Sequence, residues 1–149
     1  MNVLIIEDEL VAQQALVRSL TTNFDDIRIV GVLDSVDKSV SWLENCQSYP
    51  DVIFMDVELS DGICFEIFEK VKISANVIIT TAYDNYAITA FKINSLDYLL
   101  KPIVEEELQR AWKRCVERIE AHHEKPPCGY HRLTLDRRPL AFRCRLVRK

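Results

Sequence analysis

Five short apolar segments rich in β-branched residues recur along this chain, each bounded by polar or turn residues. They occupy residues 3–6, 27–33, 52–55, 77–79 and 96–100. Runs of this length and composition are typical of buried β-strands. The intervals between them are too long for hairpins, which indicates crossover connections between parallel strands.

Apolar residues at helical spacing fill the intervals and predict one helix in each. The residues that define these faces are Ala12, Leu16 and Leu20; Val36, Val40 and Leu43; Ile63, Ile67 and Val71; Ala87, Ala90 and Phe91; Leu108, Trp112, Cys115 and Ile119. Strict alternation of strand and helix predicts an α/β fold with helices on both faces of the sheet. We expect a doubly wound five-stranded parallel sheet in the flavodoxin-like order 2-1-3-4-5.

The last helix is expected from about Val104 to about His122, because Pro126 and Pro127 forbid its continuation. We therefore expect a first domain at residues 1–122 and a linker with a basic tail at 123–149. About 20 residues cannot bury a core of their own. The tail is thus a linker, part of a further domain, or sequence added to the natural protein.

The charges of the chain are unevenly distributed. Residues 125–149 hold eight of the 19 Lys and Arg residues and one of the 23 acidic residues, which leaves 11 basic and 22 acidic residues before them. An acidic body argues against a nucleic-acid surface, because phosphate contacts need clustered Lys and Arg. We also expect the tail alone to bind no specific DNA sequence.

The chain is expected to be cytoplasmic and not associated with a membrane. The first apolar run stops at Glu7 and Asp8 after four residues, so we expect neither a signal peptide nor a membrane span. The five cysteines are an odd number without a CxxC pair, which suits reduced thiols.

Polar residues follow four of the predicted strands at their carboxyl ends. Glu7 and Asp8 follow the first strand, Asp56 the third, Thr80 and Thr81 the fourth, and Lys101 the fifth. In open parallel sheets ligands bind at this edge. Three neighbouring carboxylates need a cation, and Mg²⁺ with its oxygen ligands suits both them and a phosphate. The pattern predicts phosphoryl transfer to the Asp56 carboxylate, with help from Thr81 and Lys101.

These residues carry a family resemblance. Glu7-Asp8, Asp56, Asp61-Gly62, Thr81-Ala82, Tyr98 and Lys101-Pro102, in this order, resemble the receiver domain of two-component response regulators over about residues 1–120. The segments 80–87 and 96–103 look like receivers of LytTR-type (LytR/AlgR-like) regulators, whose output is a separate DNA-binding domain. No such effector domain is expected in this sequence, because it would need roughly 100 more residues.

The resemblance implies a role for each matching residue. Asp8, Asp56 and the backbone carbonyl of Glu58 would bind Mg²⁺ (or Mn²⁺), with Glu7 acting through water. Thr81 and Lys101 would contact the phosphoryl group, and Tyr98 would turn inward on activation. The Lys101–Pro102 peptide bond would be cis. Glu7 stands where the family more often has aspartate.

The resemblance also implies partners. A sensor histidine kinase would donate the phosphoryl group, and the chain would be no enzyme beyond its own phosphorylation and dephosphorylation. A homodimer would form through the helix near residue 87, the strand at 96–100 and the last helix. DNA would be contacted only through an effector domain.

Two other functions fit parts of the pattern. Asp56-Val57-Glu58-Leu59-Ser60 distantly resembles the signature of haloacid-dehalogenase-like phosphatases, with Asp56 as nucleophile and Glu58 near the general-acid position, but this leaves Glu7 and Asp8 unexplained. A flavin-binding electron carrier needs a phosphate loop after the first strand, where Glu7-Asp8-Glu9 would repel the phosphate.

Overall fold

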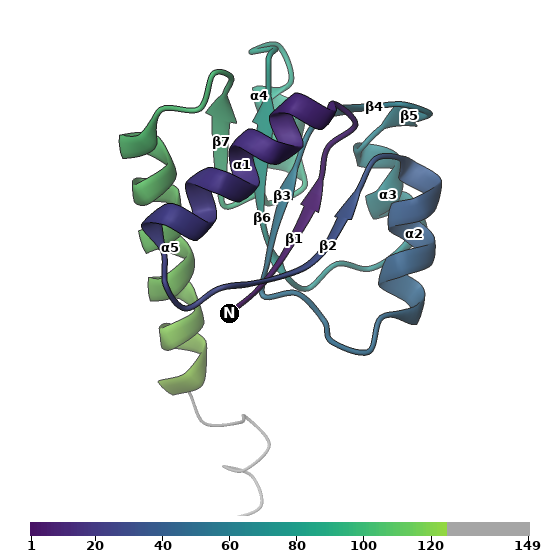
Figure 1. Cartoon of the computed structure of the whole chain (residues 1–149). Helices are drawn as coiled ribbons and strands as arrows, with labels where there is room; N and C mark the ends of the chain where they lie inside the picture. Colours follow the sequence, from purple (N-terminus) through teal and green to yellow (C-terminus); the bar gives the residue numbers. More distant parts are fainter. Residues whose placement is uncertain (125–149) are drawn as a thin grey trace, which may run out of the picture. The chain divides into compact units, whose positions relative to one another are not determined.

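The computed structural model describes residues 1–124 (Figure 1). The predicted basic tail at 125–149 lies outside this range, and the expected boundary at residue 122 stays a prediction. The elements follow in the order β1 (Asn2–Ile6), α1 (Leu10–Asn23), β2 (Arg28–Leu33), α2 (Val36–Asn45), β3 (Val52–Met55), β4 (Glu58–Leu59), β5 (Gly62–Ile63), α3 (Phe65–Lys70), β6 (Asn76–Thr81), α4 (Ala87–Lys92), β7 (Asp97–Leu100) and α5 (Glu105–Glu124).

The main sheet has five parallel strands in the order β2-β1-β3-β6-β7. These are the five apolar segments found in the sequence, so the predicted doubly wound fold and its strand order are confirmed. The short strands β4 and β5 form a separate antiparallel pair. The order of the main sheet puts the ends of β1 and β3 side by side, at the point where the direction of winding reverses.

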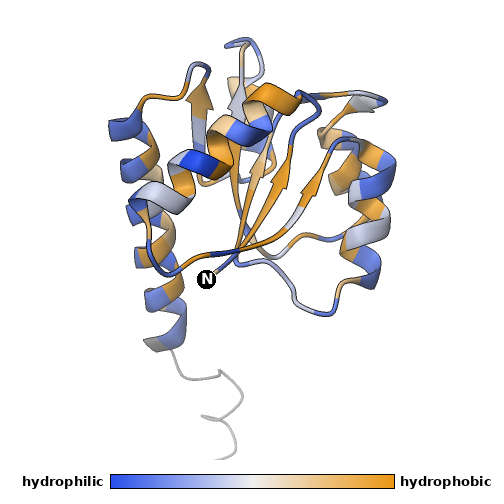
Figure 2. Ribbon diagram, viewed as in Figure 1, coloured by the Kyte–Doolittle hydropathy of each residue, from blue (hydrophilic) through white to orange (hydrophobic). Residues whose placement is uncertain are grey.

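Successive side chains along each strand point to opposite faces of the sheet, so the core has two parts, one on each face. Leu4 and Ile6 of β1 belong to one buried cluster that includes residues from α2, α3 and α4. Val3 and Ile5 are also fully buried and point to the opposite face, on the side of α1. Figure 2 shows the strands as the apolar interior and the helices with mixed surfaces. Each fully buried aliphatic side chain contributes about 1.5–3 kcal/mol.

Helices α1 and α5 meet on that opposite face. Phe24, directly after α1, stacks on Trp112 of α5 with ring centroids 4.6 Å apart. Asn23 donates a hydrogen bond to the Glu105 carboxylate at 3.4 Å and accepts one from Gln109 at 3.3 Å. These contacts hold the start of α5, and with it the segment after β7, against α1.

Two predicted helix faces are wrong in part. Ile63 was expected in a helix but lies in β5 and is 36% exposed, because Ser60 and Asp61 form a turn between β4 and β5. Phe91 was expected on a buried face but is 84% exposed. Helix α4 has only six residues, and Ala90 is its buried residue.

Close packing requires glycine at one position of β2. A Cβ atom on Gly31 would lie 3.1 Å from Leu4 Cδ1 and 3.2 Å from Trp42 Nε1. Contacts this short need the neighbours to move. Gly31 thus lets α2 approach the sheet through Trp42.

The chain divides into two units after Cys115, within α5. The first unit, Met1–Cys115, holds the whole sheet and the polar residues at its carboxyl edge. None of the helices within residues 1–124 is long and apolar enough to cross a membrane.

Candidate metal and phosphoryl site

Backbone hydrogen bonds beyond the strand ends position the polar residues. Glu7 N donates to Leu33 O at 2.8 Å, Asp56 N to Ile6 O at 2.9 Å, and Lys101 N to Thr81 O at 2.8 Å. Each bond continues the ladder of a parallel strand pair by one residue. The carboxyl ends of β1, β3, β6 and β7 therefore bring together residues that are far apart in the sequence.

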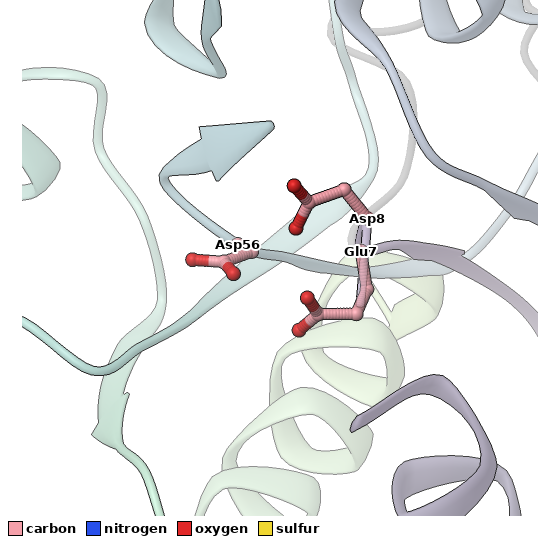
Figure 3. A group of neighbouring side chains, drawn as sticks. All are labelled: Glu7, Asp8 and Asp56. Carbon is pink, nitrogen blue, oxygen red and sulfur yellow. The ribbon is translucent and has the colours of Figure 1, made fainter. Parts of the chain in front are cut away.

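Glu7, Asp8 and Asp56 form an acidic cluster at this edge (Figure 3). One carboxylate oxygen from each residue lies within 4.8 Å of the others. Glu7 is 2% exposed and Asp56 is 7% exposed, whereas Asp8 is open to solvent. Mutual repulsion between buried carboxylates is costly unless a cation offsets it. Oxygen ligands in this number suit Mg²⁺ or Mn²⁺, so the donor set fits the predicted metal.

Lys101 supplies a cation from the protein itself. Its Nζ lies 2.5 Å from Glu7 Oε2 and 2.9 Å from Asp56 Oδ2. The lysine side chain is 21% exposed, so these ion pairs are only partly screened by water. One ammonium group is paired with two of the three carboxylates, which leaves the site with net negative charge.

Burial raises the pKa of Glu7 from 4.5 to about 7, although the hydrogen bonds from Lys101 and from the Glu9 amide oppose the shift. The Lys101 pKa is affected in two directions: burial lowers it, but the hydrogen bonds to Glu7 and Asp56 raise it further. The net result is a Lys101 pKa above its ordinary value. The lysine therefore stays charged near neutral pH, while Glu7 gains or loses its proton there.

Thr81 and Tyr98 both form a hydrogen bond with the backbone of Tyr83. Thr81 is fully buried at the end of β6, and its Oγ1 accepts a hydrogen bond from Tyr83 N at 3.4 Å. The Tyr98 hydroxyl donates to the Tyr83 carbonyl. Both side chains thus hold the backbone that connects β6 to α4.

Glu58 lies in β4, and its backbone amide approaches Asp56 Oδ1 at 3.4 Å. Its carboxylate accepts a hydrogen bond from the Tyr86 hydroxyl at 3.5 Å. Burial raises the pKa of Tyr86, and the neighbouring Glu58 carboxylate adds to the effect. Sequence reasoning identified Glu58 but missed Tyr86, because the two residues are in contact only once α4 has packed.

Two further supporting residues were not recognised from the sequence. Gln13 Nε2 donates to the Glu7 carbonyl at 2.6 Å and so holds the turn after β1. Asp61, named in the sequence only among the residues that carry the family resemblance, accepts hydrogen bonds from Val36 N at 2.6 Å and Asp37 N at 3.1 Å. The bond from Val36 is the main reason that the pKa of Asp61 is lowered. An aspartate next to glycine indicates a turn. Nothing in the sequence around Asp61 indicates that its carboxylate also caps a helix that begins 25 residues earlier, at Val36.

The peptide bond between Lys101 and Pro102 is cis, which confirms the prediction from the sequence.

The family model of the response regulator receiver domain matches residues 3–113. This chain belongs to the response-regulator receiver family. The sensory transduction protein LytT of Bacillus cereus is 36% identical over 131 residues, which are 83% of this chain and 52% of LytT. The transcriptional regulatory protein BtsR of Salmonella typhi is 35% identical over 115 residues, which are 76% of this chain and 47% of BtsR.

Among solved structures, the response regulatory domain of protein mrkE from Klebsiella pneumoniae is similar, with a TM-score of 0.70 and 28% identity. The match covers 81% of this receiver chain and 99% of that domain. The receiver chain spans about half the length of the curated relatives it matches. Its resemblance to LytT-type response regulators is thus confirmed, and nothing in these comparisons supports the phosphatase alternative.

Proposed function

We propose that Asp56 is the phosphoacceptor of this receiver and takes its phosphoryl group from a sensor histidine kinase in a Mg²⁺-dependent reaction. The observation that carries the proposal is the position of the Lys101 ammonium between Asp56 and Glu7, beside the Asp8 carboxylate. This arrangement offers a nucleophile, a fixed positive charge and oxygen ligands for a cation in one place.

In the proposed transfer, an Asp56 carboxylate oxygen forms a bond to phosphorus as the bond from phosphorus to the kinase imidazole nitrogen breaks. The electron pair of the broken bond stays with the imidazole. Lys101 already lies 2.9 Å from Asp56, so a phosphoryl group on that carboxylate would come within reach of its ammonium. The Thr81 hydroxyl would donate a hydrogen bond to a second phosphoryl oxygen.

Asp8, Asp56 and the Glu58 carbonyl would hold the cation, with Glu7 acting through water. When bound, Mg²⁺ supplies positive charge that offsets the charge on the transferring oxygens. Glu7 then has a second role, because its carboxylate competes with the phosphoryl group for the Lys101 ammonium. Phosphorylation would draw Lys101 away from Glu7.

We propose that output follows from a change on the surface made by α4, β7 and the first turns of α5. Ile88 is 74% exposed, Phe91 84% and Leu100 42% on this surface. Exposed apolar residues of this size favour a protein contact. A two-fold dimer through them would bring together two copies of an effector domain, through which a full-length protein would contact DNA. Tyr98 would link this surface to Thr81. The proposed location is the cytoplasm.

Phosphorylation can be tested by incubating the chain with acetyl phosphate and Mg²⁺ and measuring intact mass. We expect one phosphoryl group on the wild type and none on Asp56→Asn, which changes little volume. Asp25→Asn is the matched control, because Asp25 is an exposed carboxylate outside the site. Equal labelling of Asp56→Asn would refute the assignment. Continuous turnover of acetyl phosphate at enzymatic rates would favour a phosphatase instead.

Dimerisation can be tested by sedimentation with and without beryllofluoride. We expect beryllofluoride and Mg²⁺ to promote a dimer of the wild type, and Phe91→Ser to prevent it. Leu10→Ser is the control, since Leu10 is 63% exposed but lies on α1. A wild type that stays monomeric, or a Phe91→Ser variant that dimerises normally, would contradict the proposed surface.

A further inference from the structure

A cavity of about 300 Å³ lies between α1 and the segment that joins β7 to α5. Its walls are mainly apolar and include Val11, Ala12, Leu16, Pro102 and Ile103. This volume is at the lower end of the range for small-molecule sites and corresponds to roughly ten water molecules. Asp8 and Asp56 are not among the lining residues, so the cavity is distinct from the face where the phosphoryl group would bind.

The polar end of the cavity contains the hydroxyl of Thr80. Thr80 lines the cavity and is 1% exposed. Its neighbour Thr81 points to the other side of the sheet, because side chains alternate along β6. Within residues 1–124 the Thr80 side chain makes no hydrogen bond, in contrast to Glu7, which is bonded to Lys101 and to the Glu9 amide. A hydrogen bond from a ligand would give this hydroxyl a partner.

The charges around the cavity restrict what it can bind. Glu7 and Glu9 contribute two carboxylates against the single ammonium of Lys101. An anionic ligand would find the Lys101 ammonium already paired and would have to compete with Glu7, whose oxygen is 2.5 Å from Lys101 Nζ. A cationic ligand would leave its charge against mainly apolar walls. An uncharged ligand avoids both costs.

We propose that this cavity binds a small uncharged molecule with an apolar body and a hydroxyl head that hydrogen-bonds to Thr80. The apolar body would lie between Ala12 and Leu16 of α1 and Ile103. The inference does not depend on phosphorylation of Asp56. However, Lys101 and Glu7 belong to both sites, so a bound ligand would contact the two residues that set the charge next to Asp56. A small molecule bound in the cavity would thus influence the phosphorylation site through these two residues.

Benzyl alcohol is a suitable probe, because it has an aromatic body and one neutral hydroxyl. We expect a saturable titration by NMR of the ¹⁵N-labelled full chain, without Mg²⁺ or a phosphoryl donor, with a dissociation constant of about 1 mM. The amide shifts should be largest at Ala12, Thr80 and Ile103. Absence of saturable shifts, or shifts centred on α4, would overturn the proposal. Because this experiment contains no phosphoryl donor, its failure is distinguishable from failure of phosphorylation.

Two variants test the position of the ligand. Ala12→Leu should fill the cavity and abolish binding, whereas Ala121→Leu, the same change at an exposed position of α5, should leave it unchanged. Thr80→Val keeps the shape but removes the hydroxyl, and should weaken binding roughly three- to tenfold. Wild-type affinity in Ala12→Leu would refute the site. If that variant loses its amide dispersion, Thr80→Val decides, since unchanged affinity there would refute the proposed hydrogen bond.

Discussion

Raising the pH from about 5 to about 8 without divalent cations should destabilise this receiver, because of Glu7. The folded protein holds Glu7 almost fully buried, and its pKa is raised from 4.5 to about 7. Below about pH 4.5 the group is protonated in both the folded and the unfolded chain and has no effect. Between about pH 4.5 and pH 7 Glu7 is ionised in the unfolded chain but still protonated in the folded one, so the free energy of unfolding falls as the pH rises. Above about pH 7 the loss is complete.

The pKa of Glu7 differs by about 2.5 units between the unfolded and the folded chain, and this difference sets the size of the effect. One unit corresponds to about 1.4 kcal/mol, so the expected loss is about 3 kcal/mol. Lys101 does not oppose this change, because its pKa is raised and it stays charged across the whole range. A domain of this kind typically has a free energy of unfolding of about 5–15 kcal/mol, so the loss is readily measured.

Urea denaturation in EDTA at several pH values would measure the effect, with Glu7→Gln as the control. Glutamine keeps the size of the side chain but carries no titratable group, so the variant should lack this part of the pH dependence. Groups distant from Glu7 affect both proteins alike, so the difference between the two proteins reports on the Glu7 site. Parallel stability curves for the two proteins between about pH 5 and pH 8 would refute the reasoning.

Three other substitutions have defined outcomes. Asp8→Asn should weaken Mg²⁺ binding by roughly tenfold and stabilise the metal-free protein, because it removes one of three clustered carboxylates; a calorimetric titration with unchanged affinity would count against Asp8 as a ligand. Gly31→Ala should destabilise the fold by about 1 kcal/mol, measured by urea denaturation, since its Cβ would press on Leu4 and Trp42. Asp61→Ala should destabilise it by about 1 kcal/mol through loss of the bonds to Val36 N and Asp37 N, and the difference from wild type should shrink in acid as Asp61 is protonated.

The sheet could be predicted from the sequence because its signal is local. Each strand is a continuous apolar run, and buried parallel strands have this pattern whatever their neighbours are. The polar residues at the strand ends were predictable for the same reason, since the carboxyl ends of parallel strands share one edge. The positions of Glu7, Asp56 and Lys101 follow from this rule alone.

Contacts between distant segments were not predictable in the same way. Ile63 had the spacing of a helical face, but the turn at Ser60 and Asp61 formed a hairpin there instead. Phe91 matched a helical period, although α4 is too short to bury it. The bond between Tyr86 and Glu58 depends on how α4 packs, which no local pattern specifies.

The hydrogen bonds that continue the strand ladders tie the residues of this site to the register of the sheet. The amides of Glu7, Asp56 and Lys101 are each bonded to the end of an adjacent strand. An insertion of one residue within β1 or β3 would turn the following side chains to the opposite face and scatter the carboxylates. A change within α2 or α3 would leave those bonds in place. Protein engineers could therefore exchange these helices, and the surfaces they present, while keeping the chemistry at the strand ends.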